Sequence, residues 1–265
     1  MSGVTIGSDP EVFVVGPDHK VVPAHHFGIP GPSDKVKTEF GSFFRDGWAL
    51  EVNPIPSKSP EALLAHIKFI LRVARKQFLP DDYKFSLRPA IDIDLKLLEE
   101  APEDVKKFGC NPAYDAYALK VVVPTVDAAT HPMRTTGCHL HFSGPTINDP
   151  EDFPKIIKML DFFVGTRMVI DAATPASRKR RTLYGRAGEF RPQMYGETLG
   201  LEWRVPDALI LANKDLFCFL VNEAVEVVNC HSVLGSLAKE TEDRVQRAIN
   251  DCDIQLCMDI LGVKH

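Results

Sequence analysis

Hydrophobic and polar residues alternate over several short stretches of this 265-residue chain, and alternation with a period of two predicts β-strands. The stretch around residue 46 contains an Asp46-Gly47 pair, which is typical of a turn between two strand segments. The predicted strands span residues 3–16, 21–24, 43–52, 85–93, 135–143 and 200–206.

Other stretches space their apolar residues three or four apart, which predicts helices. Ser59-Pro60-Glu61 is a typical helix start, and the apolar spacing continues to about Leu79. The predicted helices span residues 59–79, 94–107, 150–171, 213–229, 239–250 and 253–261, whereas residues 28–35, 110–117 and 176–186 are expected to be irregular, the last as a basic loop.

No repeat, low-complexity segment or linker divides the sequence. We therefore expect residues 1–265 to form a single α+β domain with a largely antiparallel sheet. The pattern leaves open whether helices 213–229 and 239–250 pack internally or across a subunit interface, so a homo-oligomer stays an alternative.

The net charge is −5, which gives no electrostatic reason to expect nucleic acid as the main partner. The apolar run 216–228 is interrupted by Asn222, Glu223 and Glu226, so no membrane span is expected. Residues 1–10 lack the basic and apolar regions of a signal peptide, which predicts a cytoplasmic protein. The six cysteines form no Cys-x-x-Cys pair, which argues against a structural zinc site.

Two histidines lie two residues apart in the predicted strand 135–143. Residues two apart in a strand share a face, so His139 and His141 are expected together on the side opposite Leu140 and Phe142. They could be hydrogen-bonded histidines on a polar sheet face or ligands of a site, and the pair alone does not decide between these alternatives.

Three glutamates lie on predicted strands that should be partly buried: Glu11, Glu51 and Glu202. A carboxylate on a half-buried strand is costly unless it is paired with a cation or ends in solvent at a strand edge. Three carboxylates and a histidine on one sheet face would suit Mg²⁺ or Mn²⁺, which prefer oxygen ligands and often bridge phosphates.

A basic segment supplies the opposite charge. Guanidinium groups grip phosphate or carboxylate oxygens through two parallel hydrogen bonds, so arginines beside carboxylates indicate a metal-bound polyphosphate. Lys179 and Arg180 are expected on an exposed, solvated loop, whereas Arg191 and Arg204 lie beside glutamates in sequence. The arginines retained as nucleotide or phosphate contacts are Arg178, Arg181, Arg191 and Arg204. Because no glycine-rich phosphate loop is present, ATP would be held by a cleft in the sheet.

Four segments occur together in an informative order: Asp9-Pro10-Glu11, Asp46-Gly47 with Glu51-Val52-Asn53-Pro54, Thr136-Gly137-Cys138-His139-Leu140-His141-Phe142-Ser143, and Glu202-Trp203-Arg204-Val205-Pro206-Asp207. Across residues 5–210 the chain resembles the carboxylate–amine ligases of the glutamine synthetase and glutamate–cysteine ligase superfamily. It looks most similar to the compact phage-encoded phiEco-type COOH·NH2 ligases, for which the location would be the host cytoplasm.

The resemblance implies a glutamine-synthetase-like catalytic domain, with a curved, largely antiparallel sheet and helices packed on its outer face. It implies ATP and two or three divalent cations, Mg²⁺ or Mn²⁺, as cofactors. Carried over by position, Glu11, Glu51 and Glu202 would be metal ligands, and His139 or His141 a metal ligand or nucleotide contact. Arg204, and with it Arg191, would grip the transferring phosphate.

The implied reaction joins a small-molecule or peptide carboxylate to an amine in an amide or isopeptide bond, through an acyl phosphate. Asp46 or Asp115 would take the amine proton. Nucleic acid is expected only as a modified base serving as substrate. The alternatives are a metal-dependent amide hydrolase, a phosphotransferase, and a non-catalytic binding protein. The amine-side loops cannot be aligned, so the resemblance does not identify the acid or the amine.

Overall fold

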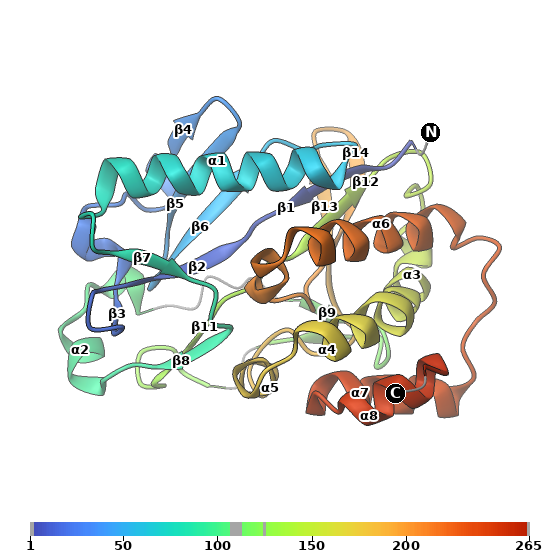
Figure 1. Ribbon diagram of the computed structural model, residues 1–265. Coiled ribbons are helices and arrows are strands. Elements are labelled where there is room, and N and C mark those ends of the chain that lie inside the picture. Colours follow the sequence, from blue (N-terminus) through green and yellow to red (C-terminus); the bar gives the residue numbers. More distant parts are fainter. Residues whose placement is uncertain (1–2, 107–112, 124–125, 264–265) are drawn as a thin grey trace.

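The computed structural model describes residues 3–106, 113–123 and 126–263, and its strands and helices form an α+β fold (Figure 1). All strand pairs among these residues are antiparallel, as the sequence predicted. In the described part of the chain, no helix is long and apolar enough to cross a membrane.

The first sheet has six strands, and it carries the two histidines. Its strands in spatial order are β1 (Thr5–Ser8), β12 (Leu140–Ser143), β14 (Thr198–Trp203), β13 (Glu189–Tyr195), β9 (Ala113–Asp115) and β10 (Lys120–Val122). The register places His141 opposite Glu202, and Glu202 opposite Arg191 on its other side. These three residues therefore share one sheet face.

The second sheet has the order β3 (Val21–Val22), β2 (Glu11–Val15), β6 (Ala49–Pro54), β5 (Gly41–Asp46) and β4 (Val36–Thr38), with β7 (Lys84–Ser86) also paired to β2. A separate two-stranded sheet joins β8 (Ala90–Asp92) to β11 (Met133–Thr135). Strands β1 and β2 follow each other directly, so the chain passes from the first sheet to the second at Asp9-Pro10 (Figure 1). The residues around this crossing lie at the border of both sheets.

The helices are α1 (Pro60–Phe78), α2 (Leu95–Glu100), α3 (Phe153–Leu160), α4 (Thr166–Ala172), α5 (Pro175–Arg181), α6 (Lys214–Cys230), α7 (Lys239–Asp251) and α8 (Ile254–Leu261). All of them except α2 and α5 contribute side chains to the core against the first sheet, whereas Leu98 of α2 packs with Phe13 of β2 in the second sheet. The side chain of Ser59 caps α1 by accepting a hydrogen bond from the amide of Ala62, as its sequence signature indicated. A π-helical turn at Asp161–Gly165 joins α3 to α4, so the helix predicted over 150–171 is nearly continuous.

The main core lies between these helices and the first sheet. Phe142 and Trp203 from the sheet pack with Phe153 of α3 and Phe217 of α6, and all four side chains are fully buried. Both α6 and α7 pack against other elements of the same chain, and the homo-oligomer stays a prediction. The residues that alternate with Phe142 on β12 and with Trp203 on β14 point to the other face of the sheet, and they include His141 and Glu202.

Several predicted elements differ from the structure. The strand expected over 85–93 is two strands separated at Leu87–Pro89, because a proline cannot donate to a central ladder. The strand expected over 135–143 is likewise split, with β11 ending at Thr135 and β12 beginning at Leu140. The helix predicted over 94–107 ends at Glu100 and is followed by a 3₁₀ turn at Glu103–Val105.

The loop expected over 176–186 is wrong for its first half, which forms α5. Thr174 and Ser177 make a reciprocal capping box, Pro175 occupies the first helical position, and the basic residues are good helix formers placed at the negative end of the helix dipole. Strand β13 was not predicted. The irregular stretch expected over 110–117 lies outside the described residues up to position 112, and Ala113–Asp115 form strand β9.

Candidate functional site

The carboxylate of Asp9 lies between two imidazoles at the crossing between the sheets. Its Oδ1 is 2.9 Å from Nδ1 of His139, and its Oδ2 is 3.3 Å from Nε2 of His141. Burial would raise the pKa of Asp9, but the two histidines outweigh it and hold the pKa well below its ordinary value. Burial also opposes protonation of His141, yet the attraction of Asp9 prevails and raises its pKa.

Glu202 lies beside this group and is held by arginines on both sides. Its Oε1 is 2.8 Å from Nη1 of Arg204, and its Oε2 is 3.3 Å from Nη1 of Arg191. One ligand atom each from Asp9, His141 and Glu202 lies within 4.8 Å of the others. These three residues, which we call the histidine group, offer carboxylate oxygens and an imidazole nitrogen.

A second cluster, the acid group, consists of Glu11, Asp46 and Glu51, whose carboxylate oxygens also lie within 4.8 Å of one another. Burial, Asp46 and Asp9 raise the pKa of Glu11 to about 8, although the amide of Gly137 donates a hydrogen bond of 2.7 Å to its Oε2. Burial and the neighbouring carboxylates also raise the pKa of Glu51 well above its usual range, and burial and Asp9 raise that of Asp46.

Both groups fit a divalent cation. In the acid group, like charges crowded in a buried place repel each other, and a cation removes both this repulsion and the cost of desolvation. The acid group offers only oxygen atoms, which suit Mg²⁺ or Mn²⁺. The histidine group offers carboxylate oxygens and one imidazole nitrogen, and either ion could bind there if phosphate oxygens of a ligand supply further oxygen atoms. Asp9 influences the pKa values of all three acid-group carboxylates, so the two groups adjoin.

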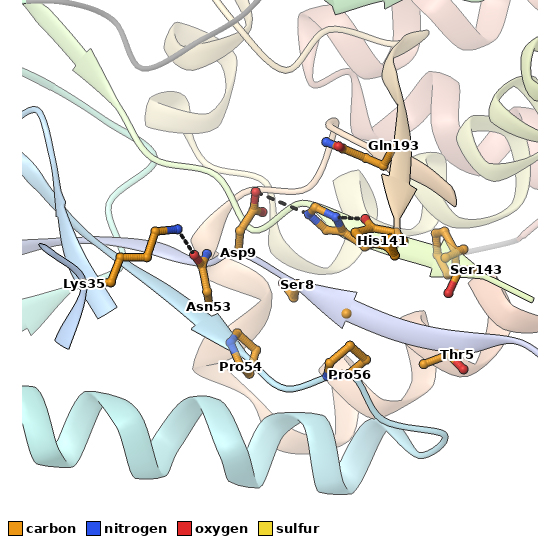
Figure 2. Close-up of a pocket in the computed structure, with 13 residues that line it drawn as sticks. Thr5, Ser8, Asp9, Lys35, Asn53, Pro54, Pro56, His141, Ser143 and Gln193 are labelled. Carbon is orange, nitrogen blue, oxygen red and sulfur yellow. Dashed lines mark hydrogen bonds and ion pairs between the residues drawn. The ribbon is translucent and has the colours of Figure 1, made fainter. Parts of the chain in front are cut away.

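A cavity of about 490 Å³ opens beside the two groups (Figure 2). Figure 2 shows Asp9 facing His141, with Gln193 and Ser143 near the histidine and Lys35 reaching Asn53 on the other side. The lining comes from β1, β6, β12 and β13 and the segment before β4: Thr5, Gly7, Ser8, Asp9, Lys35, Asn53, Pro54, Pro56, His141, Phe142, Ser143, Gln193 and Tyr195. The volume is within the usual range for a small-molecule site.

The structure separates the roles of the two histidines. His139 is buried, and its Nε2 lies 2.9 Å from the hydroxyl of Tyr184 while its Nδ1 faces Asp9, so both ring nitrogens are engaged by the protein. His141 lines the cavity and belongs to the histidine group, and its Nδ1 lies 2.5 Å from the hydroxyl of Tyr195. The ring nitrogens of both histidines thus face protein groups, but of the two it is His141 that lines the cavity, which makes it the better placed for a ligand.

The basic segment does not gather at the cavity. Arg178 lies 3.7 Å from Asp251, and Arg181 is buried with its guanidinium on the sulfur of Cys252, so both face α7 and its end. The exposed loop position expected for Arg180 is wrong, since its side chain is fully buried and donates to the backbone oxygens of Val205 and Arg204. Within the described residues, Lys179 forms an ion pair with Asp92 on β8.

Sequence reasoning missed several residues of the site. Asp9 is two positions before Glu11 in a segment that was recognised, but it sits at the break between two strands, where alternation gives no signal. Tyr184 has its ring over the guanidinium groups of Arg180 and Arg204, and its hydroxyl accepts a hydrogen bond from Arg204. Asp115 does not reach the site, because its carboxylate accepts hydrogen bonds from the amides of Tyr117 and Ala118 and so caps a turn.

No protein-family model and no curated protein sequence matches the chain. Among solved structures, it is similar to a bifunctional glutathione synthetase from Pasteurella multocida, with a TM-score of 0.51, 12% identity, and coverage of 99% of this chain and 45% of that one. Two further similarities are weaker: glutamate–cysteine ligase from Francisella tularensis in complex with AMP (TM-score 0.49, 11% identity, 96% and 72% covered) and apo GmaS (0.44, 12%, 98% and 69%).

The chain thus spans less than half the length of the glutathione synthetase structure, and at this identity the likeness concerns the fold alone. Antiparallel sheets carry the candidate site on one face and helices on the other, as the resemblance implied. The chain therefore has the expected glutamine-synthetase-like α+β fold, which it shares with the bifunctional glutathione synthetase.

Proposed function

We propose that the protein is an ATP-dependent carboxylate–amine ligase of the phiEco type, which forms an amide or isopeptide bond through an acyl phosphate. The observation that carries this proposal is the pair of adjoining ligand groups, acid and histidine, beside one cavity. The sequence resemblance and the shared fold agree with it.

The acid group and the histidine group would hold the divalent cations, Mg²⁺ or Mn²⁺. When bound, such cations neutralise the phosphate oxygens of a nucleotide and withdraw charge from a phosphoryl group in transfer. Glu202 is oriented by its ion pairs with Arg204 and Arg191. In this proposal the two arginines act first as supports of a ligand, and they stay candidates for contact with the transferring phosphate.

The cavity would hold the nucleotide. It is lined by the aromatic ring of Tyr195 and two prolines, which suit a planar base, and by the polar groups of Ser143 and Gln193. His141 lies at its inner side next to Asp9, where phosphate oxygens would meet the cations. His139 does not line the cavity, and its contact with Asp9 orients that carboxylate.

Two displacements complete the proposed reaction. An oxygen of the substrate carboxylate attacks the γ-phosphorus of ATP, and ADP leaves; the amine then attacks the acyl carbon, and inorganic phosphate leaves. The amine must lose a proton, and Asp46 is our candidate to accept it, in which case Glu11 and Glu51 are the acid-group ligands of the cation. Burial and the negative charge of Asp9 raise the pKa of the Asp46 carboxyl, which favours proton uptake.

The test is a screen for ADP release with ATP, Mg²⁺ or Mn²⁺, and pairs of acids and amines drawn from amino acids and polyamines, with mass detection of the product. The proposal expects ADP release that requires both an acid and an amine, and a product lighter than their sum by one water. Amide cleavage without ATP would show a hydrolase instead, and a phosphorylated amine or guanidine would show a phosphotransferase. Absence of Mg²⁺–ATP binding in calorimetry would favour a non-catalytic binding protein.

A further inference from the structure

Lys35 lies in the segment between the 3₁₀ turn Pro32–Asp34 and β4, where the sequence predicted only a loop. Its side chain lines the cavity beside the acid and histidine groups. Among the thirteen described residues that line this cavity, Lys35 is the one lysine or arginine.

Contacts on two sides hold the ammonium of Lys35 in place. Its Nζ donates a hydrogen bond of 2.8 Å to Oδ1 of Asn53 and lies 4.1 Å from the centre of the Phe44 ring. The other end of the Asn53 amide donates a hydrogen bond of 2.8 Å to Oε1 of Glu51. A chain of contacts therefore leads from the cavity through Lys35 and Asn53 to Glu51 of the acid group. Figure 2 shows its first contact, between Lys35 and Asn53.

The arginines that the sequence assigned to phosphate are placed differently. Arg204 is 3% exposed, and its guanidinium contacts Glu202 and Tyr184. Arg191 also pairs with Glu202, and neither arginine lines the cavity. Lys35 is exposed and carries its charge on a flexible stem, so it can move toward a ligand without leaving a buried charge behind.

The position of Lys35 matches one part of a nucleotide. Through Asn53 it lies on the side of the cavity toward the acid group, whereas Ser143 lines the other side, beyond His141. Its positive charge also acts on Asp46, one of the acid-group carboxylates, and lowers the pKa of that carboxyl against the effect of burial. An anion that reaches this side would meet both Lys35 and a cation held by the acid group.

We propose that Lys35 binds the terminal phosphates of the nucleotide in this cavity and is the side chain that distinguishes ATP from AMP there. This inference rests on the proposed function. On binding, the ammonium exchanges its hydrogen bond with the Asn53 amide oxygen for charge-assisted hydrogen bonds to phosphate oxygens. Phe44 supports the stem of the side chain in both positions through its ring.

The experiment is calorimetric titration of the full chain with AMP and with a non-hydrolysable ATP analogue, each with Mg²⁺. The variants are Lys35→Met and Lys35→Arg, and Lys37→Met is the matched control, because Lys37 is an exposed lysine two residues away on β4 that does not line the cavity. Thermal unfolding of each variant checks that the fold is intact, which is expected since both lysines are exposed.

Lys35→Met should weaken binding of the ATP analogue by about 10- to 100-fold, as expected for loss of a charged hydrogen bond, and leave AMP binding unchanged. Lys35→Arg should restore part of the loss, and Lys37→Met should bind both nucleotides like the wild type. Equal ATP-analogue affinity of wild type and Lys35→Met, or an equal loss for AMP, overturns the assignment of Lys35 alone. A wild-type protein that binds neither nucleotide overturns the proposed function and this inference together.

Discussion

Glu11 on β2 lies directly opposite Glu51 on β6 in the antiparallel ladder. Like charges directly opposite each other destabilise a sheet, and here burial adds to the repulsion, as the raised pKa values of both carboxyls show. Asp46 is added to the same cluster from β5. An arrangement that costs stability in the metal-free protein is reasonable where a bound cation removes the cost.

We expect Glu51→Gln to raise the stability of the metal-free protein and to reduce its stabilisation by metal, since the histidine group keeps its ligands. Glutamine keeps an oxygen to accept the hydrogen bond from Asn53, but it carries no charge to oppose Glu11. The gain without metal should be about 0.5–1 kcal/mol, the size of a cross-strand charge effect. Thermal unfolding in EDTA and in Mn²⁺ measures both parts. A wild-type midpoint that does not change with Mn²⁺ contradicts the assignment of a cation to the acid group.

Asp161 gives a pH dependence that is separate from the candidate metal ligands. Burial raises the pKa of its carboxyl to about 7, although Trp203 and the amide of Gly188 donate hydrogen bonds of 2.9 and 2.6 Å to it. The folded state thus keeps a proton that the unfolded chain loses near pH 4. Stability from this group should fall as the pH rises from about 4 to 7, by up to about 1.4 kcal/mol per pH unit, and level off above.

Urea unfolding of the wild type and Asp161→Asn at pH 5, 6 and 7 tests this expectation. The asparagine variant cannot titrate, so the difference in unfolding free energy between the two proteins should change with pH in favour of the variant as the pH rises. Parallel pH curves for the two proteins would falsify the raised pKa of Asp161.

The sequence identified the glutamates of the site better than its basic side chains. Glu11, Glu51 and Glu202 stand on strands that are mostly apolar and buried, so a carboxylate on each of them indicated a site. His139 precedes β12 rather than belonging to it, but it contacts Asp9 together with His141, as their two-residue spacing predicted.

The basic segment shows the opposite limit. Sequence charge cannot distinguish a guanidinium that satisfies buried carbonyl oxygens from one that binds phosphate, because both use the same donors. Arg180 was expected in solvent and is fully buried, whereas Lys35, in an ordinary loop, lines the cavity. These positions depend on contacts between segments far apart in sequence, such as Arg180 with Val205 and Lys35 with Asn53.

Arg180→Ala should therefore act on stability. The variant loses two hydrogen bonds to backbone oxygens, leaves those oxygens unpaired, and opens a cavity against Gly185, for a cost of about 3 kcal/mol. Arg178→Ala is the matched control from the same helix, and its exposed ion pair with Asp251 should contribute less than about 0.5 kcal/mol. Urea unfolding compares the two, and equal stabilities would contradict the structural role of Arg180.

Tyr184→Phe should lower the rate of the proposed reaction with little change in nucleotide affinity. The hydroxyl contacts Nε2 of His139 and accepts a hydrogen bond from Arg204. It therefore connects the histidine that orients Asp9 with the arginine that orients Glu202. Loss of such an indirect support of a metal ligand commonly costs about 10-fold or more. Steady-state kinetics should show a reduced kcat with KM for ATP nearly unchanged, whereas Tyr114→Phe, whose residue lies on β9 with a partly exposed ring, should leave both constants unchanged.

Glu202→Gln should abolish metal-dependent ADP release and also destabilise the protein. The carboxylate is 1% exposed and lies between the guanidinium groups of Arg204 and Arg191. The neutral amide leaves these two guanidinium groups with a weaker partner, which should lower the free energy of unfolding by about 3 kcal/mol. Activity should therefore be measured at a temperature where unfolding shows that the variant is still folded. Glu202→Asp keeps the charge but shortens the side chain, and it should retain more stability than Glu202→Gln while losing most activity, since the carboxylate withdraws from the histidine group. Full activity in either folded variant would show that Glu202 is not a metal ligand.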